Sequence, residues 1–95
     1  MITKTITWSL FQRDNLTISF EDLGLIDPQD ISFEAYVKHL KSLKKRLNTE
    51  RVSSIAVYHT LFYEGQCNTE FSPKILAILV ELNATLCLTA QNDAV

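Results

Sequence analysis

The sequence predicts an α/β (α+β) domain, a two-layer sandwich in which two helices cover a four-stranded sheet. Apolar residues recur every second position in four segments, as in strands, and every third or fourth position in two others, as in helices. The order of these segments is ββαβαβ, which favours helices packed against one sheet. A chain of 95 residues has room for one core, so we expect a single domain over residues 1–95.

The first two strands are predicted to form a hairpin. Ile6, Trp8 and Leu10 alternate with threonine and serine, and we expect this apolar phase to face the core and the hydroxyl-bearing phase to face solvent. A polar turn at residues 12–15 separates this strand from a second alternating run at residues 16–20. Residues 21–30 break the pattern and are expected to form a loop with a short helical turn.

Two helices and two further strands complete the prediction. The first helix begins at Ser32 or through residues 27–28 and ends near Asn48, and the second begins at Ser72 and closes near Asn83. Residues 52–63 carry apolar groups on both faces, which favours a central strand covered at least partly on both sides. Residues 85–89 are predicted as a last short strand and residues 91–95 as a frayed tail.

The core is expected to draw on every predicted element. Its members share the apolar phase of their helix or strand: Ile6, Trp8, Leu40, Leu43, Ile55, Val57, Ile75, Leu79 and Leu86.

Several of these segments resemble a known protein family. The run Thr7-Trp8-Ser9-Leu10, residues 32–40, residues 54–58 and the segment from Phe71 to Leu86 are similar to the later part of the bacterial domain of unknown function 4279 family. In that family a tryptophan strand precedes a helix, a strand, a loop, a Ser-Pro helix and a final strand. The resemblance implies a fold and no chemistry, because the family carries no established activity.

Composition and charge argue against two classes of partner. A net charge of −2 and a pI near 5.6 disfavour binding to a phosphate backbone. The longest apolar stretch, residues 75–80, is far shorter than the roughly 20 residues of a membrane span. The N-terminal residues alternate in polarity, unlike a signal peptide, so a cytoplasmic location is expected.

No sequence motif indicates catalysis, a metal site or a cofactor. Cys67 and Cys87 lack the spacing of a disulfide framework or a zinc site, and His39 and His59 belong to no metal-binding arrangement. We expect Cys87 and His59 to be buried and His39 to be solvated. A small enzyme that uses Cys67 or His59 is the weakest of the functional alternatives.

Charges are segregated along the chain, which suggests two candidate binding surfaces. The proposed partner-binding residues are acidic and precede the first helix: Asp14, Glu21, Asp22, Asp27 and Asp30. The alternative is the basic face of the first helix, formed by Lys38, Lys41 and Lys45. The helix dipole accounts for part of this segregation.

These observations favour a small, non-catalytic protein-binding module. It would cover a partner protein with a basic surface, in the manner of a bacterial immunity or inhibitor protein that binds a toxin, since complementary charge speeds such association. The alternative is a housekeeping or structural protein that forms a homodimer through the hydroxyl-rich strand at residues 3–9.

Overall fold

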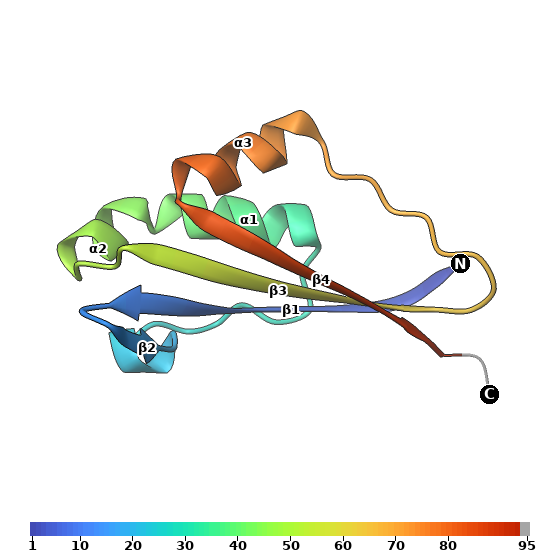
Figure 1. Cartoon of the computed structure of the whole chain (residues 1–95), viewed down its shortest axis with the longest axis horizontal. Helices are drawn as coiled ribbons and strands as arrows, with labels where there is room; N and C mark the ends of the chain where they lie inside the picture. The colour runs from blue at the N-terminus through green and yellow to red at the C-terminus, as the bar shows by residue number, and fades with distance from the viewer. Residues whose placement is uncertain (94–95) are drawn as a thin grey trace.

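The structure is a computed structural model that describes residues 1–93. In chain order its elements are β1 (Ile2–Arg13), β2 (Leu16–Ile18), the 3-10 helix η1 (Glu21–Leu23), α1 (Phe33–Ser42), α2 (Lys44–Thr49), β3 (Ser54–Tyr63), α3 (Pro73–Glu81) and β4 (Ala84–Asn92). The strands form one sheet in the order β2-β1-β3-β4, and α1, α2 and α3 lie on the same side of it (Figure 1). The predicted α+β sandwich, with a four-stranded sheet and two main helices, is confirmed.

The sheet is mixed. β1 pairs antiparallel with β2 and β3, whereas β3 and β4 are parallel. β2 pairs with only three residues of β1, so within residues 1–93 most of the outer edge of β1 has no strand neighbour. Asp14 and Asn15 form the hairpin turn with φ angles of 50° and 66°. Aspartate and asparagine tolerate this left-handed conformation better than most side chains do.

Both main helices begin as predicted. The Ser32 and Ser72 hydroxyls accept hydrogen bonds from the backbone N–H groups of Ala35 (3.1 Å) and Ile75 (3.3 Å), so each serine caps a first turn. The prediction of a single long helix after Ser32 is wrong, because the helix is interrupted at Leu43, between α1 and α2. There the N–H bonds back three residues to the Leu40 carbonyl, which tightens the last turn before α2 begins.

The predicted orientation of β1 is also wrong. Ser9 and Phe11 are buried at 4% and 0% exposure, whereas Ile6 and Trp8 are each 41% exposed. Phe11 and Ser9 pair with Ile55 and Val57 of β3, so they share the face that the helices cover. Alternation along a strand separates two faces but does not say which of them meets the helices. The apolar phase of β1 therefore lies on the uncovered face of the sheet.

The remaining core agrees better with the sequence. Leu40, Ile55, Val57, Ile75 and Leu79 are buried as expected, and Leu43 and Leu86 pack against them while partly exposed. Tyr36, Val37, Leu47 and Leu82, which lie on the apolar stripes of the two predicted helices, are buried as well. Core residues that the prediction did not include, most of them from β2, η1 and the loop between them, are Phe11, Ile18, Phe20, Leu23 and Ile78.

The C-terminal strand is longer than predicted. β4 extends to Asn92 and so includes the first part of the expected tail, while residues 94–95 lie outside the described part of the chain. None of the described helices is both long enough and apolar enough to cross a membrane.

Candidate functional site

The first candidate surface is the side of the sheet that faces away from the helices, here called the open face. Pairing across β1, β3 and β4 aligns its side chains in three rows, namely Ile6–Thr60–Thr89, Trp8–Tyr58–Cys87 and Leu10–Ala56–Thr85. No helix among residues 1–93 covers these rows. The sequence-based expectation that β3 is covered at least partly on both sides is therefore wrong as far as the described helices are concerned.

An aromatic pair forms the centre of the open face. The Trp8 and Tyr58 rings are stacked, with centroids 4.1 Å apart and planes inclined by 10°. Phe62 lies on the same face, and the Lys4 ammonium sits 5.8 Å from its ring centroid. Tryptophan and tyrosine are enriched among the residues that dominate protein interfaces. A cluster of partly exposed apolar side chains on one surface is typical of an interaction site.

Three of the five proposed acidic residues have partners within the chain. Asp14 pairs with Arg51 at 2.9 Å, Asp22 accepts a 2.8 Å hydrogen bond from the Ser19 N–H, and Asp27 is bonded to Tyr36. These contacts stabilise the β1–β2 turn and the segment between β2 and α1.

Glu21 and Asp30 are exposed, and neither forms an ion pair within the described part of the chain. They are the acids most available to a partner.

A buried hydrogen-bond chain fixes the coil between η1 and α1. The Tyr36 hydroxyl lies 2.8 Å from the Ser9 hydroxyl and donates to Asp27 Oδ1 at 3.0 Å. Burial raises the pKa of Asp27, and the hydrogen bond from Tyr36 opposes that rise. Residues 28–31 of this coil line a small cavity together with residues 4–7 of β1. The acidic coil thus runs beside the unpaired edge of β1.

The basic candidate is split by the break in the helix. Lys38 and Lys41 of α1 line a groove between α1 and α3, together with Lys74, but Lys45 belongs to α2 and does not line it. Lys38 is paired with Glu34 at 2.9 Å. The three lysines therefore do not form the single helical face that the sequence suggested.

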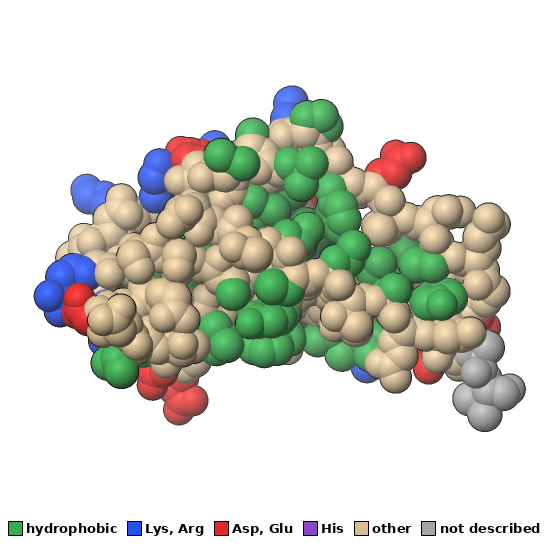
Figure 2. Space-filling view, viewed as in Figure 1, with side chains coloured by type: hydrophobic (Ala, Val, Ile, Leu, Met, Phe, Trp, Pro, Cys, Tyr) green, Lys and Arg blue, Asp and Glu red, His purple; other side chains and the backbone are tan. Residues whose placement is uncertain are grey.

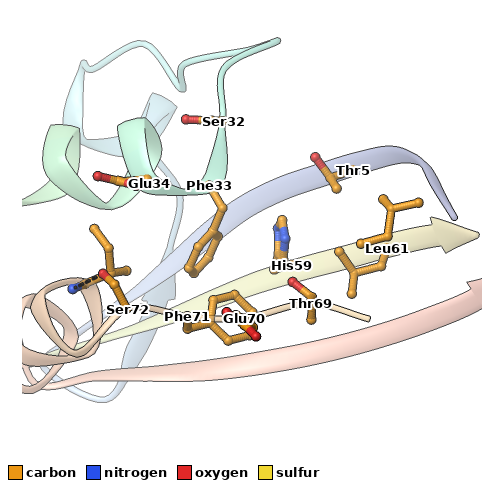
Figure 3. Close-up of a pocket in the computed structure, with 12 residues that line it drawn as sticks. Thr5, Ser32, Phe33, Glu34, His59, Leu61, Thr69, Glu70, Phe71 and Ser72 are labelled. Carbon is orange, nitrogen blue, oxygen red and sulfur yellow. Dashed lines mark hydrogen bonds between the residues drawn. The ribbon is translucent and has the colours of Figure 1, made fainter. Parts of the chain in front are cut away.

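The second candidate site is an aromatic cavity of about 320 Å³, close to the beginnings of α1 and α3. Its walls include Phe33, the first residue of α1, and Phe71, just before α3, while His59 and Leu61 come from β3 (Figure 3).

On the face seen in Figure 2, hydrophobic side chains gather across the middle of the molecule, and charged side chains lie toward its margins.

His59 is the buried polar group of this cavity. It is 3% exposed, and its Nδ1 lies 2.7 Å from the Thr7 hydroxyl. The imidazole packs against Phe33 with ring centroids 4.4 Å apart, and Phe33 in turn meets Phe71 edge-on at 5.0 Å. Burial lowers the pKa of His59. The expected burial of His59 is confirmed, and its partner is a side chain.

The cysteines do not extend this site. Cys67 is half-buried and does not line the cavity that holds His59. Cys87 is also half-buried and lies on the open face. The expectation that it is buried is therefore wrong, because no helix in the described part of the chain covers that face. His39, expected to be solvated, is half-buried.

The described residues 1–93 contain no cluster of potential metal ligands. Nowhere in that range do three or more histidine, cysteine, aspartate or glutamate side chains come together as a metal ion requires.

Sequence reasoning missed both the aromatic cavity and the open face. Phe33 follows the predicted capping residue Ser32 and Phe71 precedes Ser72, but no local pattern indicates that the two rings meet. The signal for the open face was present in the apolar phase of β1, but it was assigned to the wrong side.

Comparison with known proteins identifies no relative. No protein-family model matches the chain, and neither does any curated protein or solved structure. The resemblance to the domain of unknown function 4279 family stays a prediction.

Proposed function

We propose that this protein is a non-catalytic protein-binding module whose open face docks on a partner protein. The observation that carries the proposal is the Trp8–Tyr58 stack on a sheet face that no described helix covers, with Ile6 and Trp8 each 41% exposed. Stacked aromatic rings already have a fixed geometry, so they lose little conformational freedom when a partner covers them.

Charge indicates the chemistry of the partner. The segment of residues 21–31 beside the edge of β1 contains four acids and no base, and its Ile26 and Ile31 are exposed. A partner with an apolar patch bordered by lysine or arginine complements this arrangement. A basic toxin or enzyme inhibited by this protein is one such partner, which is the role of an immunity or inhibitor protein.

The test is affinity purification from the native host, followed by reconstitution with the purified partner. Thr89→Arg places a charge on the open face at an exposed position in the row of Ile6. Val80→Ser is the matched control, because Val80 is 80% exposed on α3, on the other side of the molecule. We expect Thr89→Arg to weaken the dissociation constant at least about 10-fold, equivalent to about 1.4 kcal/mol, and Val80→Ser to leave it unchanged.

The same purified protein distinguishes a homodimer from a complex with a different partner protein. Light scattering across a range of concentrations should show a monomer when the partner is absent. A dimer that Thr89→Arg dissociates would assign the open face to a second copy of this chain and would refute the heterologous partner.

The acidic segment is tested by association kinetics. Glu21→Ser with Asp30→Ser removes two exposed acids and spares the bonds made by Asp22 and Asp27. Association should slow in this variant and with added salt, because salt screens interactions beyond roughly 8–10 Å. Equal rates would exclude the acidic segment, and a defect on changing Lys38 and Lys41 instead would move the site to the α1–α3 groove.

A further inference from the structure

The aromatic cavity is separate from the open face and is not used by the proposed function. It opens on the helix side of the sheet, between the beginnings of α1 and α3, whereas the open face lies on the opposite side. Its apolar walls are formed by Ile2, Phe33, Leu61, Phe71 and Ile75. The polar residues that line it are Thr5, Ser32, Glu34, His59, Thr69, Glu70 and Ser72 (Figure 3). Apolar and aromatic walls that also carry polar groups are a common composition of a small-molecule site.

One ring nitrogen of His59 is available to an occupant. The Thr7 hydroxyl engages Nδ1, which leaves Nε2 of a ring that lines the cavity. Buried polar atoms are almost always hydrogen-bonded, and every fully buried side-chain nitrogen or oxygen of the described residues has a partner. An Nε2 that has no partner within the described residues is therefore not fully buried, so it faces the cavity and would meet a hydrogen-bonding group of a ligand.

The surroundings disfavour an anion. Among the described residues no lysine or arginine lines the cavity, whereas the carboxylate residue Glu70 does. The helix beginnings offer fewer backbone donors than usual, because the N–H groups of Ala35 and Ile75 are bonded to Ser32 and Ser72 and Pro73 has no N–H.

A cation is disfavoured as well, because two features oppose the attraction of Glu70, which also lines the cavity. Glu34 is paired with Lys38, and its carboxyl points away from His59 in Figure 3. Each helix beginning carries roughly half a positive charge, so two of them oppose a cation at this place. Burial also disfavours the positively charged form of His59 and so lowers its pKa.

We propose that this cavity binds a small, uncharged, mainly apolar ring compound with one hydrogen-bonding group directed at His59 Nε2. The cavity measures about 320 Å³, and a dry protein cavity of about 150 Å³ holds benzene. A single ring with short substituents therefore fits. The apolar walls supply the affinity, and the imidazole nitrogen sets the orientation of the ligand.

The test is an NMR titration of the whole chain with four ring compounds of similar size. Phenol is neutral with one hydroxyl, toluene has no hydrogen-bonding group, benzoate is an anion and benzylamine is a cation. We expect phenol to shift the His59, Phe33 and Phe71 resonances saturably, with a dissociation constant at least about 10-fold lower than those of the other three, as expected for one well-placed hydrogen bond.

Two variants assign the binding to this cavity. Thr5→Leu fills it from an exposed position on β1 and should abolish the phenol shifts, whereas Thr17→Leu, an equivalent change at an exposed position on β2, should preserve them. His59→Phe keeps the ring and removes the nitrogen, and it should reduce phenol binding to the level of toluene.

Several results would overturn the proposal. These are no saturable shift with any compound, benzoate or benzylamine binding as tightly as phenol, or phenol binding unchanged in Thr5→Leu. If His59→Phe does not fold, the comparison of phenol with toluene in the unmodified chain tests the role of the nitrogen. Failure here leaves the open-face experiment unaffected, because Thr89 lies on the other side of the sheet.

Discussion

Neighbouring substitutions in β1 test which side of the strand faces the core. Phe11 is fully buried and meets Phe20 edge-on at 5.0 Å, whereas Leu10 is half-buried on the open face. Phe11→Ala leaves a cavity under the helices and should cost about 3–5 kcal/mol. Leu10→Ala removes three half-buried carbons, each worth about 0.8 kcal/mol when fully buried, and leaves no cavity, so it should cost about 1 kcal/mol.

The difference is large relative to the stability of the domain. A chain of 95 residues has an unfolding free energy of roughly 5–14 kcal/mol. With a urea dependence of about 1 kcal/mol/M, the midpoint of Phe11→Ala should lie about 2 M or more below that of Leu10→Ala. Urea unfolding followed by circular dichroism measures both midpoints. An equal loss in the two variants, or a larger loss for Leu10→Ala, would refute the assignment of the faces.

Three further predictions concern pH and metal dependence. Burial lowers the folded-state pKa of His59, so as pH falls the unfolded chain binds a proton at His59 before the folded chain does. The unfolding free energy should therefore decrease as pH drops below about 6.5. In urea melts at pH 5–7, His59→Gln should show a weaker dependence of the unfolding free energy on pH. Burial raises the folded-state pKa of Asp27, so the folded chain binds a proton there more readily and Asp27 should favour folding as pH falls toward about 4. Asp27→Asn removes the buried charge and should raise the unfolding free energy near pH 7 by less than about 1 kcal/mol. A lower unfolding free energy for this variant in calorimetry would contradict the prediction. Chelator or reductant should leave the melting temperature unchanged, and a large drop with either would reveal a metal or disulfide that supports the fold.

Local signals in the sequence predicted the elements well. Ser32 and Ser72-Pro73 placed the helix beginnings because a capping hydroxyl and a proline act on the adjacent turn alone. The hairpin turn followed from polar residues that tolerate positive φ. The break at Leu43 was missed because the apolar spacing continues through it, and only packing shows that Leu40 and Leu47 lie on separate helices.

The candidate sites depended on long-range packing and could not be predicted in the same way. Trp8 looked like a core residue because an apolar phase normally faces the helices, yet Ser9 occupies the covered side with its hydroxyl bonded to Tyr36. A buried serine is tolerated there because its partner lies 27 positions away, and no local pattern reveals such a pair. The aromatic cavity likewise joins Phe33, His59 and Phe71, which are distant in the sequence.

The central claim, that a partner protein covers the open face, is tested most directly at Trp8, the only tryptophan in the chain. Fluorotryptophan incorporated there gives one fluorine NMR signal, whose difference between ordinary and heavy water reports its contact with solvent. We predict a clear solvent effect in the free protein, as expected for a side chain in a residue that is 41% exposed, and loss of that effect when the purified partner is added. A signal shielded from solvent in the free monomer, or one that stays solvent-sensitive in the complex, would contradict the claim.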